Sequence, residues 1–335
     1  MKRKSIIILL ALLTVLTFCE CSKKIKIGLL MDSLEQERWA KDRDIFLGKI
    51  KELGGETIYR LANGNADNQL EQARELLNKG VNLLVVIPVD QDKAADIVNV
   101  AHKNRVRVLS YDRLIKNCNL DFYISFDNVD VGRLQAEYLT KICPAGNFAI
   151  IGGAITDNNS FLLKLGQMSV LQPYVDNGAI KIVYDQYVSR WSAKEGYDKM
   201  KECLRKTNYN VDAVIAANDE IATGITAALE EVNLDGRIYL CGQDADLAAI
   251  RRIIAGTQSM TVYKPIEAIA TVAARTSMDI ARNELTTNTS LSVNNGKILV
   301  PSILLPAMVV NKETIKLTVI ADGYLKENKI YENTD

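Results

Sequence analysis

Histidine is nearly absent from this sequence: His102 is the single histidine among 335 residues. Its scarcity argues against metal centres built on several histidines and against nucleophilic triads that need a histidine base. Net charge is also lacking, because 41 lysine and arginine residues balance 41 aspartate and glutamate residues. Without surplus positive charge the chain lacks the electrostatic footprint of nucleic-acid binding. We therefore expect no metal, no cofactor and no nucleic-acid partner.

Cysteine is sparse and scattered. The four cysteines beyond the N-terminal segment, Cys118, Cys143, Cys203 and Cys241, form no CxxC motif. An exported protein is permitted disulfides, but these spacings do not define a pairing. Cys203 and Cys241 lie in apolar periodic segments, which favours buried thiols over reactive ones.

Long apolar runs are missing except at the N-terminus, where a basic start leads into an apolar stretch ending at Phe18. That stretch is too short to span a bilayer and has the length of a signal-peptide core. Cys19 and Cys21 follow it directly, as in lipoprotein signals, although Phe18 and Glu20 are not the usual small residues before a lipidated cysteine. We predict a signal peptide over residues 1–21 with lipidation at Cys19 or Cys21; an uncleaved membrane anchor is the alternative.

Apolar runs then alternate with amphipathic segments along the rest of the chain. Strands are predicted at 24–31, 57–61, 82–87, 106–111, 122–126, 148–151, 180–186, 213–216, 238–241 and 259–263. Helices are predicted at 36–53, 68–79, 92–104, 158–172, 192–206, 219–232, 245–255 and 265–283. This repeated order of strand and helix predicts an α/β fold with two doubly wound, Rossmann-like parallel sheets in series.

The segment after the second sheet begins with a late helix and continues through a polar loop at 286–296 into a tail of strand and helix. Such a tail implies several crossovers between the lobes, which together make a multi-strand hinge. We predict an N-terminal lobe of residues 24–126 plus 265–303. The C-terminal lobe is predicted to contain residues 127–262 plus 304–330.

Polar and aromatic residues gather just after the predicted strands, where open parallel sheets bind their ligands. In chain order the main ones are Asp32, Arg38, Trp39, Asp112, Arg113, Asp157, Asn159, Trp191, Asn218, Gln243, Asp244 and Lys264. The two tryptophans fall one in each lobe, and aromatic rings stack on the C–H faces of a sugar. Asp, Asn and Arg side chains bond adjacent hydroxyls in pairs. We therefore expect a small, hydroxyl-rich ligand.

The charges in this set balance, and each residue also has a simpler explanation. Three acids, Asp112, Asp157 and Asp244, offset three bases, Arg38, Arg113 and Lys264, and a neutral set favours an uncharged ligand. As alternatives, Asn158 and Asp219 are candidate helix N-caps. A lone Arg38 or Lys264 is more often a solvated surface charge, and a lone tryptophan usually belongs to the core. The coincidence of such residues at the same sheet ends favours a binding site.

Six motifs make the chain resemble a known family. They are ERWAKDRD at 37–44, YDR at 111–113, DFYISFDN at 121–128, DNN at 157–159, GQDAD at 242–246 and TVYKP at 261–265. With these motifs in order, residues 24–326 closely resemble the D-xylose-binding branch of the type I periplasmic sugar-binding proteins of bacterial ABC importers.

The resemblance implies a role for each matching position. It implies hydrogen bonds to a pentose from Arg38, Arg113, Asn159, Asn218, Asp244 and Lys264, with Trp39 and Trp191 on either side of the sugar. Asp157 lies in the same motif as Asn159, and we predict that Asp112 and Asp157 also contact the ligand. It further implies a monomer in the periplasm or cell envelope that hands D-xylose, or a related monosaccharide, to an inner-membrane ABC permease. Residues 189–190 match no family motif, which leaves the choice among pentoses open.

Three other functions are alternatives. Asp244 and Asp246 form a carboxylate pair of the kind used in glycoside hydrolysis, but alternating residues point in different directions. A sugar-responsive repressor needs an N-terminal helix-turn-helix where this chain has an apolar leader. The third alternative keeps the binding and presents the closed form to a membrane kinase or chemoreceptor instead of a permease.

Overall fold

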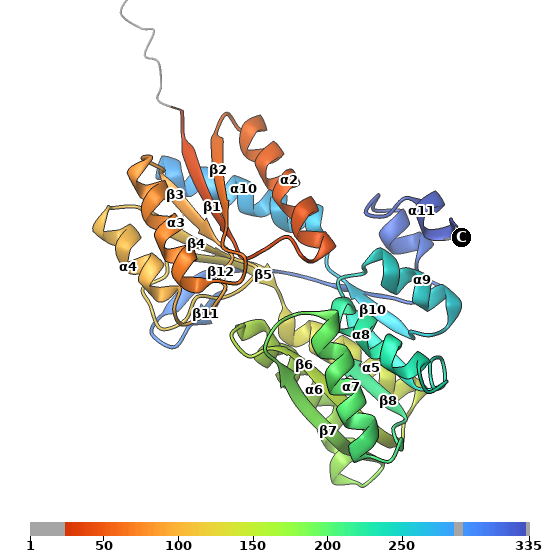
Figure 1. The fold of residues 1–335 in the computed structure, drawn as a ribbon. Helices are drawn as coiled ribbons and strands as arrows, with labels where there is room; N and C mark the ends of the chain where they lie inside the picture. Colours follow the sequence, from red (N-terminus) through yellow and green to blue (C-terminus); the bar gives the residue numbers. More distant parts are fainter. Residues whose placement is uncertain (1–23, 285–290, 333–335) are drawn as a thin grey trace, which may run out of the picture.

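The structure, a computed structural model, describes residues 24–284 and 291–332. Figure 1 shows two α/β lobes, each built on its own sheet, which confirms the predicted fold class. The predicted signal peptide with Cys19 and Cys21, and part of the predicted polar loop, lie outside the described residues. Within the described ranges, no helix is long and apolar enough to cross a membrane.

The sheet of the first lobe has seven strands in the order β11-β12-β5-β4-β3-β1-β2. In chain order they are β1 (Lys26–Met31), β2 (Glu56–Leu61), β3 (Leu83–Val86), β4 (Arg107–Tyr111), β5 (Phe122–Phe126), β11 (Ser292–Asn294) and β12 (Leu299–Leu305). Neighbouring strands run parallel except β11, which pairs antiparallel with β12. The carboxyl ends of the parallel strands therefore meet at one edge.

Helices cover both faces of this sheet. They are α2 (Glu37–Glu52) with α10 (Ile266–Arg282), and α3 (Ala66–Asn78) with α4 (Ala95–Lys103). Alternate residues of β1 supply the two cores, because successive strand side chains point to opposite faces. Leu29 packs in the cluster that contains Phe46 of α2, whereas Leu30 packs in the cluster that contains Leu76 of α3.

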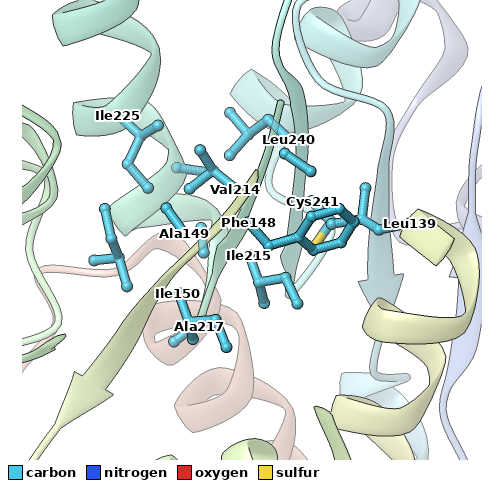
Figure 2. Packing of buried hydrophobic residues seen from close by; sticks show 14 of the residues in the cluster. Leu139, Phe148, Ala149, Ile150, Val214, Ile215, Ala217, Ile225, Leu240 and Cys241 are labelled. Atoms are coloured by element: carbon cyan, nitrogen blue, oxygen red, sulfur yellow. The ribbon is translucent and has the colours of Figure 1, made fainter. Parts of the chain in front are cut away.

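The sheet of the second lobe has six strands in the order β13-β10-β9-β8-β6-β7. They are β6 (Gly146–Ala154), β7 (Ile180–Val188), β8 (Ala213–Ala216), β9 (Tyr239–Gln243), β10 (Met260–Tyr263) and β13 (Met308–Val310). Only β13 is antiparallel to its neighbour among the paired strands of this sheet that the structure describes. Figure 2 shows the buried side chains of β6, β8 and β9 converging with those of the flanking helices.

The helices of the second lobe pack in close pairs. They are α5 (Asn128–Ile142) with α6 (Asn158–Asp176), and α7 (Ala193–Lys206) with α8 (Asp219–Glu230), followed by α9 (Leu247–Ala255). Glycines set the spacing: a Cβ at Gly166 would lie 1.9 Å from the Val129 carbonyl oxygen, and one at Gly224 would lie 1.8 Å from that of Ala193. These backbones touch, so a larger residue does not fit without moving a helix.

Most of the predicted strands and helices are present, with differences at α5, α6 and β11 (Ser292–Asn294), which lies inside the predicted polar loop. The sequence analysis missed α5, which begins where the Asp127 side chain accepts a hydrogen bond from the Asp130 N–H at 3.1 Å. It also ended α6 too early, because the helix continues past Pro173 to Asp176. The four cysteines that the structure describes are buried and free.

The chain passes between the sheets three times. It leaves the first sheet after β5 to form α5, returns after β10 to form α10, and leaves again between β12 and β13. A short tail, with a π-helical turn at Lys316–Ile320 and α11 (Glu327–Tyr331), packs around Tyr263 and Val310 at the end of the second sheet. Three adjacent passages allow the lobes to bend about a common line.

Candidate functional site

A small polar cavity lies between the lobes. Its lining contains all ten site residues predicted from the sequence, namely Arg38, Trp39, Asp112, Arg113, Asp157, Asn159, Trp191, Asn218, Asp244 and Lys264. The lining comes from both lobes, so a molecule bound there would contact both. A wider outer cleft adjoins it and shares Trp39, Arg113 and Trp191.

Arg38 connects the lobes by forming an ion pair with an acid of each lobe. It stands in the first turn of α2, where Nη2 donates to Asp112 Oδ2 at 2.9 Å and Nη1 donates to Asp244 Oδ1 at 3.2 Å. Burial lowers the pKa of this guanidinium, but Asp112, Asp244 and Asp42 outweigh burial and raise the pKa well above its ordinary value. Only 2% of the residue is exposed, so the surface-charge alternative is wrong here.

Arg113 makes the second ionic connection. Its Nε lies 2.9 Å from Asp157 Oδ2 in the second lobe, while Nη1 donates to Asp32 Oδ2 at 2.9 Å and to the Pro88 carbonyl at 3.1 Å. Burial raises the pKa of Asp157, and the attraction of Arg113 opposes that rise only in part. The same Asp157 oxygen accepts a hydrogen bond from Trp191 Nε1 at 3.2 Å.

Lys264 completes the charge balance from the passage between β10 and α10. Its Nζ lies 2.9 Å from Asp244 Oδ1, and 4% of the residue is exposed, so it too is no surface charge. Burial raises the pKa of Asp112 and Asp244, but the nearby cations Arg38 and Lys264 lower it by more. The pKa of both carboxyls is therefore below its ordinary value. Both acids are therefore ionised at neutral pH.

The two tryptophans are held differently. Trp39 is 4% exposed, belongs to a core cluster of the first lobe and donates from Nε1 to Gln36 Oε1 at 3.0 Å. The Arg38 guanidinium lies over its ring, 4.4 Å from the centroid. Trp191 is half-buried and lies against Gly153, where an added Cβ would come within 2.1 Å of the indole. Because Gly153 has no side chain, the Trp191 ring can occupy this space.

Two site residues in the second lobe also start helices. Asp157 Oδ1 accepts from the Asn159 N–H at 2.9 Å at the beginning of α6, and Asn218 Oδ1 accepts from the Ile221 N–H at 3.0 Å at the beginning of α8. The suggested caps Asn158 and Asp219 are therefore wrong by one residue. Capping fixes these side chains at the cavity wall.

Asn159 links the capped helix α6 to the first lobe. Its Nδ2 lies 3.2 Å from the Asp112 carbonyl oxygen and 3.3 Å from Asp112 Oδ1. Asp112 therefore contacts Arg38 on its own lobe and Asn159 on the other. The cavity wall is one connected hydrogen-bond network that crosses between the lobes.

Sequence reasoning missed Gln36 and Asp42 at the site, and it noted Asp32 and Gln243 at strand ends without including them among the predicted ligand contacts. Gln36 and Gln243 line the cavity, Asp32 holds Arg113, and Asp42 lies below Arg38. Asp42 was detectable as a partner four positions after Arg38 on one helix. It accepts a hydrogen bond from the Tyr111 hydroxyl, and burial raises its pKa to about 6.

The cavity offers donors and acceptors for hydroxyl groups on rigid supports. Its carboxylates are engaged with arginine and lysine, and Asp246 does not line it. Across residues 24–284 and 291–332, no cluster of histidine, cysteine or acidic side chains is arranged to hold a metal. The arrangement is suited to holding a neutral, hydroxyl-rich molecule.

Two lobes around one enclosed polar cavity define a class of binding protein that closes on a small ligand. The chain belongs to the periplasmic binding protein family, whose domain model matches residues 27–285. It is 44% identical to the D-xylose-binding periplasmic protein of Escherichia coli K12, over 98% of this chain and 100% of that one. The protein of the same name in Haemophilus influenzae is 43% identical over 99% and 100%.

Solved structures agree with the family. A solute-binding protein of an ABC transporter from Clostridium phytofermentans, solved with β-D-glucose, superposes with a TM-score of 0.83 at 26% identity. The match covers 91% of this chain and 99% of that one. The predicted family and fold are thus confirmed.

Proposed function

We propose that this protein captures one monosaccharide, D-xylose, between its lobes and delivers it to an ABC import permease. One observation carries the proposal: the ten predicted residues converge on a single small cavity, in a chain 44% identical to a D-xylose-binding periplasmic protein. The relatives support the pentose, and the solved neighbour with glucose supports a monosaccharide of similar size.

The chemistry of the wall supports binding of an uncharged sugar. Three cationic and three acidic side chains line the cavity, so a charged ligand would upset the balance of charge in its wall. Each sugar hydroxyl both donates and accepts, and so bonds carboxylate, amide and guanidinium groups alike. Trp39 and Trp191 supply apolar ring faces from opposite lobes. We propose that the ten residues predicted from the sequence are the ligand contacts.

Several contacts form only when the two lobes come together, and these contacts stabilise the closed state. The pairs Arg38–Asp244 and Arg113–Asp157 join the lobes directly, as does the hydrogen bond from the Gln91 N–H to the Thr156 carbonyl at 2.9 Å. A ligand that touches both lobes favours the closed state by its greater affinity for it. We place the hinge at the three passages, with lobes of residues 24–126 plus 265–303 and 127–262 plus 304–330.

The remaining features of the proposal concern place and partners. We propose a monomer in the periplasm or cell envelope, tethered by a lipid at Cys19 or Cys21, that binds without catalysis. The carboxylates support binding without turnover, because Asp112 and Asp244 are held ionised by neighbouring cations and neither is a proton donor at neutral pH. A permease then recognises the closed form.

Calorimetric titration with xylose, ribose, arabinose, galactose and glucose tests the proposal. We expect xylose to bind tightest, at one site per chain, and to be recovered unchanged after long incubation with the protein. Tightest binding of a hexose would overturn the pentose assignment. Turnover of xylosides would overturn the claim that the protein only binds.

A further inference from the structure

Three buried polar atoms at the cavity have no hydrogen-bond partner: Arg38 Nε, Asn159 Oδ1 and Gln243 Oε1. The residues that carry them are 2%, 5% and 3% exposed. A buried polar atom left unbonded destabilises a protein, so nearly all such atoms in folded proteins have partners. Three of them around one cavity indicate that a ligand supplies the missing hydrogen bonds.

Gln243 differs from the other two residues because its side chain does not bond Asp112. Arg38 and Asn159 use their remaining polar atoms to bond Asp112, which explains their positions independently of any ligand. Gln243 is the last residue of β9, beside Val262 of β10 and directly before Asp244. That position brings its amide to the cavity wall, where the amide oxygen has no protein donor.

We propose that Gln243 Oε1 accepts a hydrogen bond from one hydroxyl of the bound monosaccharide, which makes Gln243 a further specificity-determining residue. This inference rests on the proposed function and adds to it. The three unbonded atoms together require a ligand with two donors and one acceptor. Hydroxyl groups supply both, whereas a ligand carboxylate or phosphate supplies acceptors only.

The residue type at 243 suits this role. A glutamate would place another negative charge beside Asp244, whose charge already serves Arg38 and Lys264. A glutamine offers an acceptor oxygen without charge, which keeps the cavity neutral for an uncharged sugar.

The test is a double-mutant cycle between Gln243→Met and single hydroxyls of the sugar. Methionine has a similar length and shape but lacks the amide oxygen. We expect Gln243→Met to weaken D-xylose binding by about 10- to 100-fold in calorimetry. For one of 1,5-anhydroxylitol (1-deoxy-xylopyranose) and 2-, 3- and 4-deoxy-D-xylose, the wild type and the variant should bind with equal affinity, because the hydroxyl that Gln243 bonds is already gone.

Gln36→Met is the matched control. Gln36 also lines the cavity, but its Oε1 accepts from Trp39 Nε1 and its Nε2 lies 3.5 Å from the Trp191 carbonyl oxygen. Any loss of affinity in that variant should be the same for all four deoxy sugars. Gln243→Glu keeps an acceptor oxygen and should therefore retain the preference for the same hydroxyl. This variant provides a second test if Gln243→Met fails to fold.

Two results would overturn the inference: native affinity for xylose in Gln243→Met, or a loss that is equal for xylose and all four deoxy sugars. Failure of the proposed function is distinguishable, because it shows in the wild type. If another sugar binds tightest, the cycle is run with the deoxy forms of that sugar. If no sugar binds, the function and this inference fall together.

Discussion

The two lobes use the same backbone arrangement at the cavity. Asp112 follows β4 with φ of 62°, and Asp244 follows β9 with φ of 99°, both in a region that residues other than glycine seldom occupy. Each main-chain N–H bonds the neighbouring strand, Asp112 to the Ile124 carbonyl at 2.7 Å and Asp244 to the Val262 carbonyl at 2.8 Å. Each lobe therefore turns one carboxylate into the cavity by the same local geometry.

The lobes differ in what surrounds that carboxylate. The first lobe adds two guanidinium groups, Arg38 and Arg113, on long side chains that reach across the cleft. The second lobe adds short side chains, Asp157 and Asn218, that are fixed as helix caps. The same backbone turn is thus accompanied by cationic side chains in the first lobe and by an acid and an amide in the second. Separating the lobes breaks two buried ion pairs, so closure and charge compensation are coupled.

The largest expected effect comes from removing a cation of the first lobe. Arg113→Ala leaves Asp157 buried and without its ionic partner, so we expect the free energy of unfolding to fall by about 3–5 kcal/mol, measured by urea denaturation. Asp157→Asn is the matched change in the second lobe. It keeps an oxygen for the cap, and Arg113 keeps Asp32, so its loss should be smaller. Equal losses would contradict this asymmetry.

Besides Asp157, whose pKa burial also raises, each lobe has a buried acid near the cavity whose pKa is raised strongly by burial. The pKa of Asp42 is raised to about 6 against Arg38 and Tyr111, with Asp112 adding to the rise, and that of Asp219 is raised to about 7. Their native states hold protons that the unfolded chain releases near pH 4, so stability falls as pH rises through these windows.

Neutral variants should remove this pH dependence. Between pH 4 and 7, Asp42→Asn should gain about 3 kcal/mol of unfolding free energy relative to the wild type. Asp219→Asn should gain more, because the pKa of Asp219 is higher. Denaturation at stepped pH measures both, and parallel curves for variant and wild type would show that the acid does not titrate in this range.

Helix packing gives the smallest expected effect and the clearest contrast between lobes. Gly224→Ala would force α8 against the Ala193 carbonyl of α7, and we expect a loss of about 1–3 kcal/mol. Gly48→Ala in α2 meets no atom within 4 Å and should gain about 0.5–1 kcal/mol, because alanine favours helix. Melting temperatures of the two variants test the contrast; a loss at both positions would remove it.

Much of the fold was predictable because each lobe repeats a simple pattern. The helix at 36–53 and the strand at 82–87 lie within a residue of α2 and β3, since apolar periodicity marks them clearly. The helix α5 was missed because the predicted strand over 122–126 runs straight into it, with a single aspartate cap between them. β11 lies inside the predicted polar loop, because a three-residue strand with few apolar residues carries little signal.

The sequence predicted which residues form the site but not which of them bond to one another. Strand-end position and the family motifs pointed to all ten residues that line the cavity. Nothing in the sequence indicated that Arg38 would bond Asp244, which lies 206 positions later, because that contact depends on how the lobes meet. Gln243 was visible at a strand end, but only the unbonded state of its oxygen distinguishes it from its neighbours.

The place of β12 has a consequence for how the protein folds. β12 pairs with β5 in the first sheet, yet the whole second sheet except β13 is encoded between them. Until β12 has paired, β5 presents an open edge, and all five of its residues are buried in the folded protein. Open edges recruit strands from other chains. The protein is therefore most prone to aggregate before β12 pairs with β5, and β12 protects this edge against misassembly.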